Sequence, residues 1–153
     1  AGPGVLVGIG DDCAVLEPSP GTRLIATTDL LLEDVHFRRR YTEPADIGWK
    51  SVAVNLSDIA SMGARPRWAL VALACPASTT LDEVEAFYAG ALALAGEHGV
   101  AVVGGDTSSS PAGWLVKTSS GSIFMELDRN DVIFAESVAG MKAAWERTAA
   151  KGP

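Results

Sequence analysis

The chain has few cysteines, few basic residues and no long apolar run, and each shortage excludes a class of protein. Its 153 residues include two cysteines, Cys13 and Cys75, whose spacing matches neither a metal-binding nor a redox motif. We therefore expect two free, buried thiols in a reducing compartment. The longest apolar runs, such as residues 68–75, are far too short to span a membrane. No basic segment followed by an apolar one opens the chain, so we expect no secretion and a cytoplasmic protein.

Basic residues are outnumbered by acidic ones, 12 against 19, which gives a formal net charge of −7. This surplus of negative charge disfavours nucleic acid and anionic membranes as partners. It still allows phosphate ligands, provided that cations lie between the carboxylates and the phosphates. The sequence contains neither a Gly-x-x-x-x-Gly-Lys-Ser/Thr loop nor a Gly-x-Gly-x-x-Gly fingerprint, so any nucleotide chemistry must use another type of site.

The length suits one compact domain with a modest core, and two helices are predicted within it. Residues 45–62 carry apolar side chains at the helical period and are followed by Gly63. The second helix begins at a capping box formed by Thr80 and Glu83, and His98 caps its far end. The expected buried faces are Trp49, Val52, Leu56 and Ile59 in the first helix and Leu81, Val84, Phe87, Tyr88, Ala91 and Leu92 in the second.

Short apolar segments predict five strands, at residues 13–17, 23–28, 67–75, 100–103 and 114–118. We expect the first two strands to pair as a hairpin, and residues 30–40 to form a loop with some extended character. The resulting order is β-β-α-β-α-β-β, an α+β layer of two helices on one mixed sheet. Residues 1–118 would form this domain, and residues 119–153 a divergent tail with a C-terminal helix at residues 136–151.

Small and acidic residues gather near the ends of these predicted elements. One cluster is Thr27-Thr28-Asp29, and others lie at residues 8–12, 55–58 and 104–107. Each cluster alone is compatible with a turn. Hard oxygen ligands of this kind nevertheless suit Mg²⁺ better than zinc or copper. We expect carboxylates from four separate elements, Asp12, Asp29, Asp58 and Asp106, to converge on one cation-filled site for a triphosphate.

Four stretches of the sequence together resemble the N-terminal half of thiamine-monophosphate kinases. They are Gly8-Ile9-Gly10-Asp11-Asp12-Cys13-Ala14, Thr27-Thr28-Asp29 followed by His36-Phe37, Asn55-Leu56-Ser57-Asp58-Ile59-Ala60-Ser61-Met62-Gly63-Ala64, and Gly104-Gly105-Asp106-Thr107. That family is part of the superfamily of aminoimidazole-ribotide synthetase and selenophosphate synthetase. The resemblance covers residues 5–117, and the combination of motifs is specific although each motif alone is weak.

The resemblance implies phosphorylation of thiamine monophosphate to thiamine diphosphate by direct transfer from ATP, assisted by several Mg²⁺ ions. It makes the expected metal ligands Asp12, Thr27, Thr28, Asp29, Asp58 and Asp106. It places Gly105 and Asp106 at ATP, and His36 at thiamine monophosphate. It also implies a homodimer whose N-terminal sheets form a shared barrel. The family's N-terminal helix and C-terminal domain have no counterpart in this sequence, so we expect an incomplete site in this chain alone.

Three alternatives remain open from the sequence. A selenophosphate synthetase would use a reactive cysteine near its N-terminus, whereas Cys13 lies within the expected metal motif. A non-catalytic dimerisation module would retain the acidic cluster as a remnant. Finally, Arg38-Arg39-Arg40 is compatible with a solvated loop and with contact to an anionic substrate tail.

Overall fold

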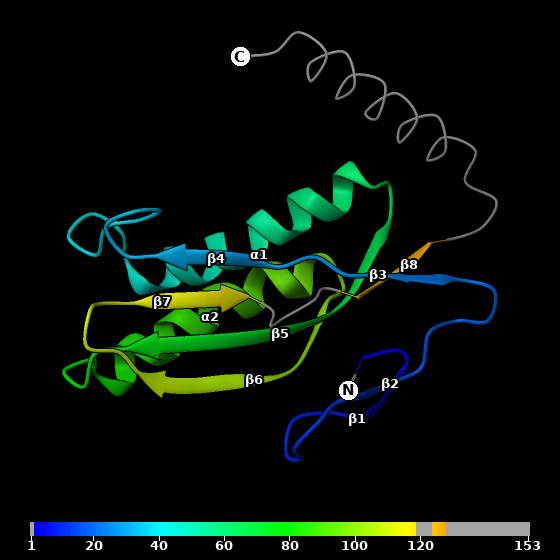
Figure 1. Ribbon diagram of the computed structural model, residues 1–153, viewed down its shortest axis with the longest axis horizontal. Coiled ribbons are helices and arrows are strands. Elements are labelled where there is room, and N and C mark those ends of the chain that lie inside the picture. The colour runs from blue at the N-terminus through cyan, green and yellow to red at the C-terminus, as the bar shows by residue number, and fades with distance from the viewer. Residues whose placement is uncertain (1, 119–123, 128–153) are drawn as a thin grey trace, which may run out of the picture.

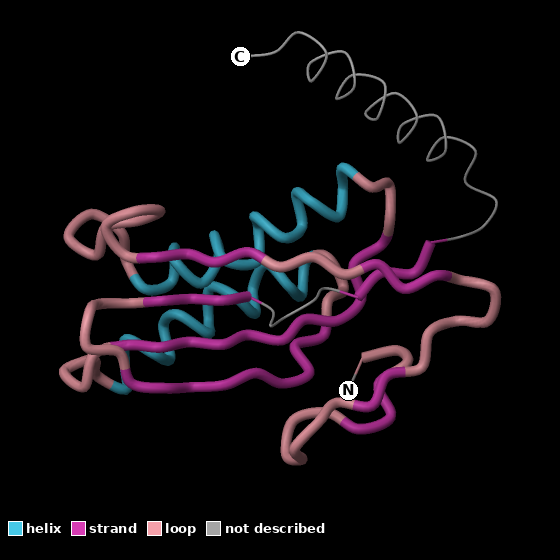
Figure 2. The backbone as a smooth tube through the Cα atoms, viewed as in Figure 1, coloured by secondary structure: helices cyan, strands magenta, loops and turns pink. Residues whose placement is uncertain are grey.

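Two helices cover one face of a six-stranded sheet in the computed structural model, which describes residues 2–118 and 124–127 (Figure 1). The helices are α1 (Pro44–Ser61) and α2 (Leu81–Glu97), and the tube view shows both behind the same side of the strands (Figure 2). The sheet strands are β3 (Arg23–Ile25), β4 (Asp29–Leu32), β5 (Arg65–Cys75), β6 (Ala101–Ser109), β7 (Leu115–Thr118) and β8 (Phe124–Leu127). This arrangement confirms the predicted α+β layer with a mixed sheet.

Strand β5 is the centre of the sheet. Along one edge it pairs in parallel with β6, and along the other it pairs with β8 near its start and with β7 near its end, both antiparallel. The outermost strands follow the same division, because β3 pairs with β8 and β4 pairs with β7. Thr27 and Thr28 therefore lie between β3 and β4, where the chain stops pairing with β8 and starts pairing with β7.

The predicted hairpin between residues 13–17 and 23–28 is wrong. A separate two-stranded sheet is formed by β1 (Val5–Val7) and β2 (Val15–Leu16), whereas β3 pairs with β8. The Glu17 amide donates to the carbonyl of Gly4 over 2.8 Å, which closes this N-terminal hairpin. The acidic stretch at residues 8–14 is thus the loop of a hairpin.

Three further strand boundaries differ from the predictions. Residues 29–32 form the strand β4 because the apolar triplet pairs with β7, so the extended character expected within residues 30–40 lies at the start of that stretch. Strand β6 runs to Ser109 instead of ending at Val103, since it pairs along the whole second half of β5. The sheet also continues past the expected boundary at residue 118, with β8. The predicted helix at residues 136–151 lies outside the described residues.

The two helices approach each other closely through glycines. A Cβ atom at Gly48 would overlap the carbonyl oxygen of Phe87, and one at Gly90 would overlap that of Ala45. The close approach buries Phe87 and Ile47 completely against the sheet. It also turns Trp49 outward, with 50% of its surface exposed, so the prediction that Trp49 belongs to the core is wrong.

Leu81 and Leu92 are 70% and 52% exposed, so their predicted burial is wrong: α2 buries a narrower face than expected. The capping box of Thr80 and Glu83 is confirmed, and His98 is the C-cap residue of α2. Among the described residues, neither helix combines the length and the apolar character that crossing a membrane requires.

Candidate functional site

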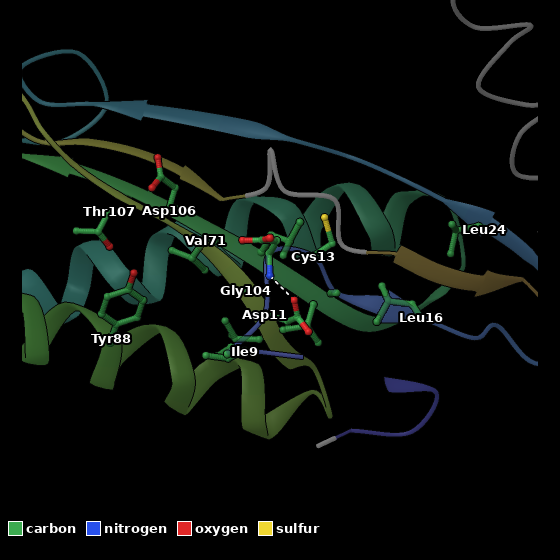
Figure 3. Close-up of a pocket in the computed structure, with 17 residues that line it drawn as sticks. Ile9, Asp11, Cys13, Leu16, Leu24, Val71, Tyr88, Gly104, Asp106 and Thr107 are labelled. Atoms are coloured by element: carbon green, nitrogen blue, oxygen red, sulfur yellow. Dashed lines mark hydrogen bonds between the residues drawn. The ribbon is translucent and has the colours of Figure 1, made fainter. Parts of the chain in front are cut away.

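An open pocket of about 840 Å³ lies between the N-terminal hairpin and strand β6 (Figure 3). Its lining comes mainly from residues 9–14 of the hairpin loop and residues 102–107 of β6. Figure 3 shows Asp106, Thr107 and Tyr88 at one end and the apolar side chains of Leu16 and Leu24 at the other. The pocket therefore combines a polar end with an apolar end.

The N-terminal hairpin is attached to the sheet by Trp68, near the start of β1. The buried indole of Trp68 donates from Nε1 to the carbonyl of Pro3 over 2.9 Å. Gly4, at a φ of 73°, leaves room for this ring, because a Cβ atom there would lie 2.7 Å from it. Asp12 is exposed on the loop of this hairpin, and its amide donates to Asp11 Oδ1 over 2.8 Å.

Strand β6 carries an irregularity where it enters the pocket. Ala69 is paired with Val102 and Leu70 with Gly104, so Val103 is an extra residue in β6. Gly105 then adopts a φ of 153°, and a Cβ atom there would overlap the carbonyl oxygen of Val71. Only glycine fits this position, and the result is an exposed backbone beside the carboxylate of Asp106.

A second cluster of polar residues lies where β3 gives way to β4. Thr27 Oγ1 donates to Asp58 Oδ2 over 2.7 Å, which joins the sheet to the last turn of α1. Partial burial raises the pKa of Asp29 above its usual value of 3.8, and the nearby carboxylate of Asp58 raises it further. The charge of His36 opposes this shift, so His36 lies near Asp29.

His36 is held by the backbone of its own loop. Its Nδ1 accepts a hydrogen bond from the Leu32 amide over 3.0 Å, and its carbonyl accepts one from Lys50 Nζ. In the neutral imidazole the proton is then on Nε2, which is available as a donor. The side chain itself is exposed.

The structure thus divides the expected ligands into two groups. Asp12, Gly105 and Asp106 line the pocket, whereas Asp29 and Asp58 belong to the second cluster. Within residues 2–118 and 124–127, no three His, Cys, Asp or Glu side chains are placed so that they alone could hold a metal ion. Convergence of all four aspartates on one cation is therefore not seen in this conformation.

Two lining residues were not expected at a site. Tyr88 was assigned to the core face of α2, yet it reaches the pocket while its ring packs edge-on against Phe87, with 5.2 Å between ring centroids. The Tyr88 hydroxyl is the sequence feature that could have indicated a place at a pocket, since a buried tyrosine needs a polar partner or solvent for that group. Cys13, expected to be buried, is exposed and also lines the pocket; Cys75 is half-buried, and both thiols are free as expected.

Comparison with known proteins identifies the family. Residues 10–123 match the model of "AIR synthase related protein, N-terminal domain", which is well over half of the chain. The chain belongs to this family. A thiamine-monophosphate kinase of Bacillus subtilis (strain 168) is 40% identical over 149 residues, which cover 90% of this chain and 45% of that protein.

Solved structures of thiamine-monophosphate kinases are similar to this chain in fold and in sequence. The thiamine-monophosphate kinase of Stenotrophomonas maltophilia K279a superposes with a TM-score of 0.71 and 43% identity, covering 84% of this chain and 38% of that one. AaThiL complexed with AMPPCP and TMP superposes with a TM-score of 0.66 and 36% identity, covering 79% and 37%. The chain therefore spans less than half the length of these relatives.

Proposed function

We propose that this chain is the nucleotide-binding and Mg²⁺-binding part of a thiamine-monophosphate kinase, which transfers a phosphoryl group from ATP to thiamine monophosphate. The observation that carries the proposal is the pocket between the hairpin loop and β6, which Asp12, Asp106 and the exposed backbone of Gly105 all line. Support also comes from the relatives, which bear that enzyme's name at up to 45% identity, and from the neighbour complexed with AMPPCP and TMP.

The pocket suits a nucleotide in size and in chemistry. Its volume of about 840 Å³ lies within the range of small-molecule sites, roughly 300–1,000 Å³. Leu16 and Leu24 offer an apolar end for a base, and Gly104 and Gly105 let phosphates approach the backbone without obstruction by side chains. Under this proposal Gly105 and Asp106 contact ATP.

The oxygen donors around the pocket and the second cluster fit Mg²⁺. This ion is usually held by one or two carboxylates, with water and substrate phosphate completing its shell, so pairs of aspartates are sufficient. Asp29 and Asp58 repel each other, and Asp58 lies at the negative end of α1, whose last turn has no basic residue. We infer that Asp12, Thr27, Thr28, Asp29, Asp58 and Asp106 are the metal ligands. Bound Mg²⁺ would neutralise the phosphate charge that these carboxylates otherwise repel.

The remaining roles follow from the same assignment. His36 would donate from Nε2 to thiamine monophosphate, whose phosphate group needs donors. We also propose a homodimer through the face of the sheet that the helices leave uncovered, where Leu30 is 43% exposed. A cytoplasmic location is proposed because ATP is a cytoplasmic co-substrate. Residues 1–118, together with β8, would supply the ATP-binding and Mg²⁺-binding unit, and the rest of residues 119–153 the tail.

Calorimetry with a non-hydrolysable ATP analogue tests the proposal. We expect the full chain to bind the analogue with Mg²⁺ and to lose most of this affinity when Mg²⁺ is removed by a chelator. Asp106→Asn should weaken binding, whereas Asp34→Asn, on an exposed carboxylate outside the pocket, should not. Equal affinity with and without Mg²⁺ would contradict the metal assignment. No binding at all would favour the non-catalytic module.

A further inference from the structure

Three consecutive arginines in the loop between β4 and α1 have three different environments. Arg38 is exposed and lies 3.9 Å from Asp34, a distance at which an exposed pair contributes little. Arg40 is exposed and lies over the ring of Tyr41. Arg39 instead points inward, with 22% of its side chain exposed. Neither a uniformly solvated loop nor a uniform anion-binding patch describes this triplet.

Arg39 contacts two elements at once. Its Nη2 pairs with Glu83 Oε1 in the first turn of α2, and its guanidinium carbon lies 4.4 Å from the centre of the Trp114 ring. A planar guanidinium can stack and pair simultaneously, which a lysine ammonium cannot do. Two nitrogens of Arg39, Nε and Nη1, are buried without a hydrogen-bond partner. Burying them carries a cost that an exposed arginine would avoid, so the inward conformation calls for an explanation.

Both partners of Arg39 are themselves fixed. The Glu83 carboxylate accepts the Thr80 amide over 2.8 Å in the capping box of α2. The Trp114 indole is 4% exposed and donates from Nε1 to Thr79 Oγ1 over 3.2 Å. Arg39 therefore ties its loop to rigid parts of the fold, and not to other mobile side chains.

The same loop carries His36 and is attached at its other end through Glu33. The Trp114 amide donates to Glu33 Oε2 over 2.8 Å, and the Glu33 amide donates to the Trp114 carbonyl over 2.9 Å. Trp114 thus meets the loop twice, at Glu33 through its backbone and at Arg39 through its ring. His36 lies between these two attachment points, with its ring fixed by the Leu32 amide.

We propose that Arg39 is a positioning residue, which holds the loop of residues 33–41 through Glu83 and Trp114 and thereby keeps the His36 ring in place between the two attachment points. The inference rests on the proposed function, in which His36 contacts the phosphorylated substrate. Arg39 neither lines the pocket nor pairs with Asp29 or Asp58, so it acts only through the geometry of the loop.

The test compares Arg39→Ala and Arg39→Lys with the matched control Arg38→Ala in the full chain. Hydrogen exchange reports on the Leu32 amide, and nitrogen NMR reports on the His36 ring, for which His98 is an internal reference because the chain has two histidines. We expect Arg39→Ala to speed exchange at Leu32 and to remove the fixed tautomer of His36, and Arg39→Lys to have an intermediate effect. Affinity for thiamine monophosphate, measured with Mg²⁺ and the ATP analogue, should fall roughly tenfold, while affinity for the analogue stays unchanged.

Two results would overturn the inference. One is an unchanged Leu32 exchange rate and His36 tautomer in Arg39→Ala. The other is a uniform loss of protection throughout α2 with no selective change at the loop, because Arg39 would then be a structural residue only. If the unaltered chain binds no thiamine monophosphate, the substrate contact proposed for His36 fails, yet the exchange and histidine measurements still decide whether Arg39 positions the loop.

Discussion

The hydroxyl of Thr27 donates a hydrogen bond to Asp58 across 2.7 Å and 31 residues of sequence. Thr27 lies at the break between β3 and β4, and Asp58 lies in the last turn of α1. The bond brings the helix end and the sheet edge together beside Asp29. Negative charge is concentrated there by two carboxylates and by the negative end of the helix dipole. A cation is the simplest way to compensate that charge.

Replacing Asp29 with asparagine should stabilise the metal-free protein at neutral pH. Because the pKa of Asp29 is raised above 3.8 in the folded state, the folded protein holds that proton more tightly than the unfolded chain. The free energy of unfolding then falls as pH rises from 3.8 through the folded pKa. The charged form at pH 7 is therefore destabilising, and Asp29→Asn should raise the melting temperature in Mg²⁺-free buffer.

The gain from Asp29→Asn should shrink as pH is lowered, because the native Asp29 becomes protonated too. Adding Mg²⁺ should stabilise the unaltered protein more than the variant, at matched ionic strength to separate binding from screening. Asp34→Asn is the control, because the Asp34 carboxylate is exposed and its backbone φ of 63° is one that asparagine also tolerates. A lower melting temperature for Asp29→Asn at pH 7 would refute the argument.

Replacing Gly105 with alanine should destabilise the fold and weaken nucleotide binding together. The new methyl group would overlap the Val71 carbonyl, which forces β6 away from β5 at the pocket. Overpacking of this kind costs about 1–3 kcal/mol. Gly96→Ala is the control, because a Cβ atom at this position of α2 meets nothing within 4 Å. That control should stabilise the protein by up to about 1 kcal/mol, through helix propensity. Chemical denaturation measures both effects.

The helices and the capping box were predictable because local periodicity and capping chemistry act within one segment. The side chain of Thr80 accepts from the Glu83 amide and the side chain of Glu83 accepts from the Thr80 amide, so the capping box needs no contact with a distant segment. The exposure of Trp49 could not be predicted in this way. It depends on the close approach of Gly48 to α2, and nothing in the sequence says which face of α1 that contact selects.

Strand pairing was harder to predict from the sequence than the helices, because each strand pairs with a segment far away along the chain. The local sequence around Leu31 indicates a loop with some extended character, and its place in a strand depends on pairing with Val116 of β7. The candidate site shows the same limit. Asp12 and Asp106 could be named from their motifs, but their sharing of a pocket depends on the hairpin that Trp68 anchors. Tyr88 enters that pocket from a helix whose periodicity indicates only core packing.

Replacing Glu83 with glutamine should lower stability at pH 7 and have little effect in acid. The hydrogen bond from the Thr80 amide, followed by that from Arg39, lowers the pKa of Glu83 below its usual 4.5. The stabilisation from a lowered carboxyl pKa is complete above 4.5 and is lost as pH falls through the folded value. Glu85→Gln, on an exposed residue of α2, is the control. Melting temperatures of the two variants should differ at pH 7 and converge below pH 4.5.

Mg²⁺ and ATP together should protect Cys13 from a thiol reagent. Cys13 is exposed and lines the pocket, whereas Cys75 is half-buried and does not line it. In the free protein Cys13 should therefore react first, and bound nucleotide should slow that phase alone. Cys13→Ser identifies the phase by removing it. Unchanged reactivity at saturating nucleotide would show that the ligand binds elsewhere.

A basic residue at position 72 should prevent the proposed homodimer. Side chains of β5 alternate between the two faces of the sheet, so Val71 and Leu73 are buried against the helices while Ala72 points to the uncovered face. Ala72→Arg places a charge at the centre of that face, where a partner sheet would have to desolvate it. Light scattering should then give half the mass of the unaltered protein. Ala93→Arg, on the exposed surface of α2, should leave the mass unchanged. A dimer that survives Ala72→Arg and dissociates with Ala93→Arg would instead place the interface on the helices.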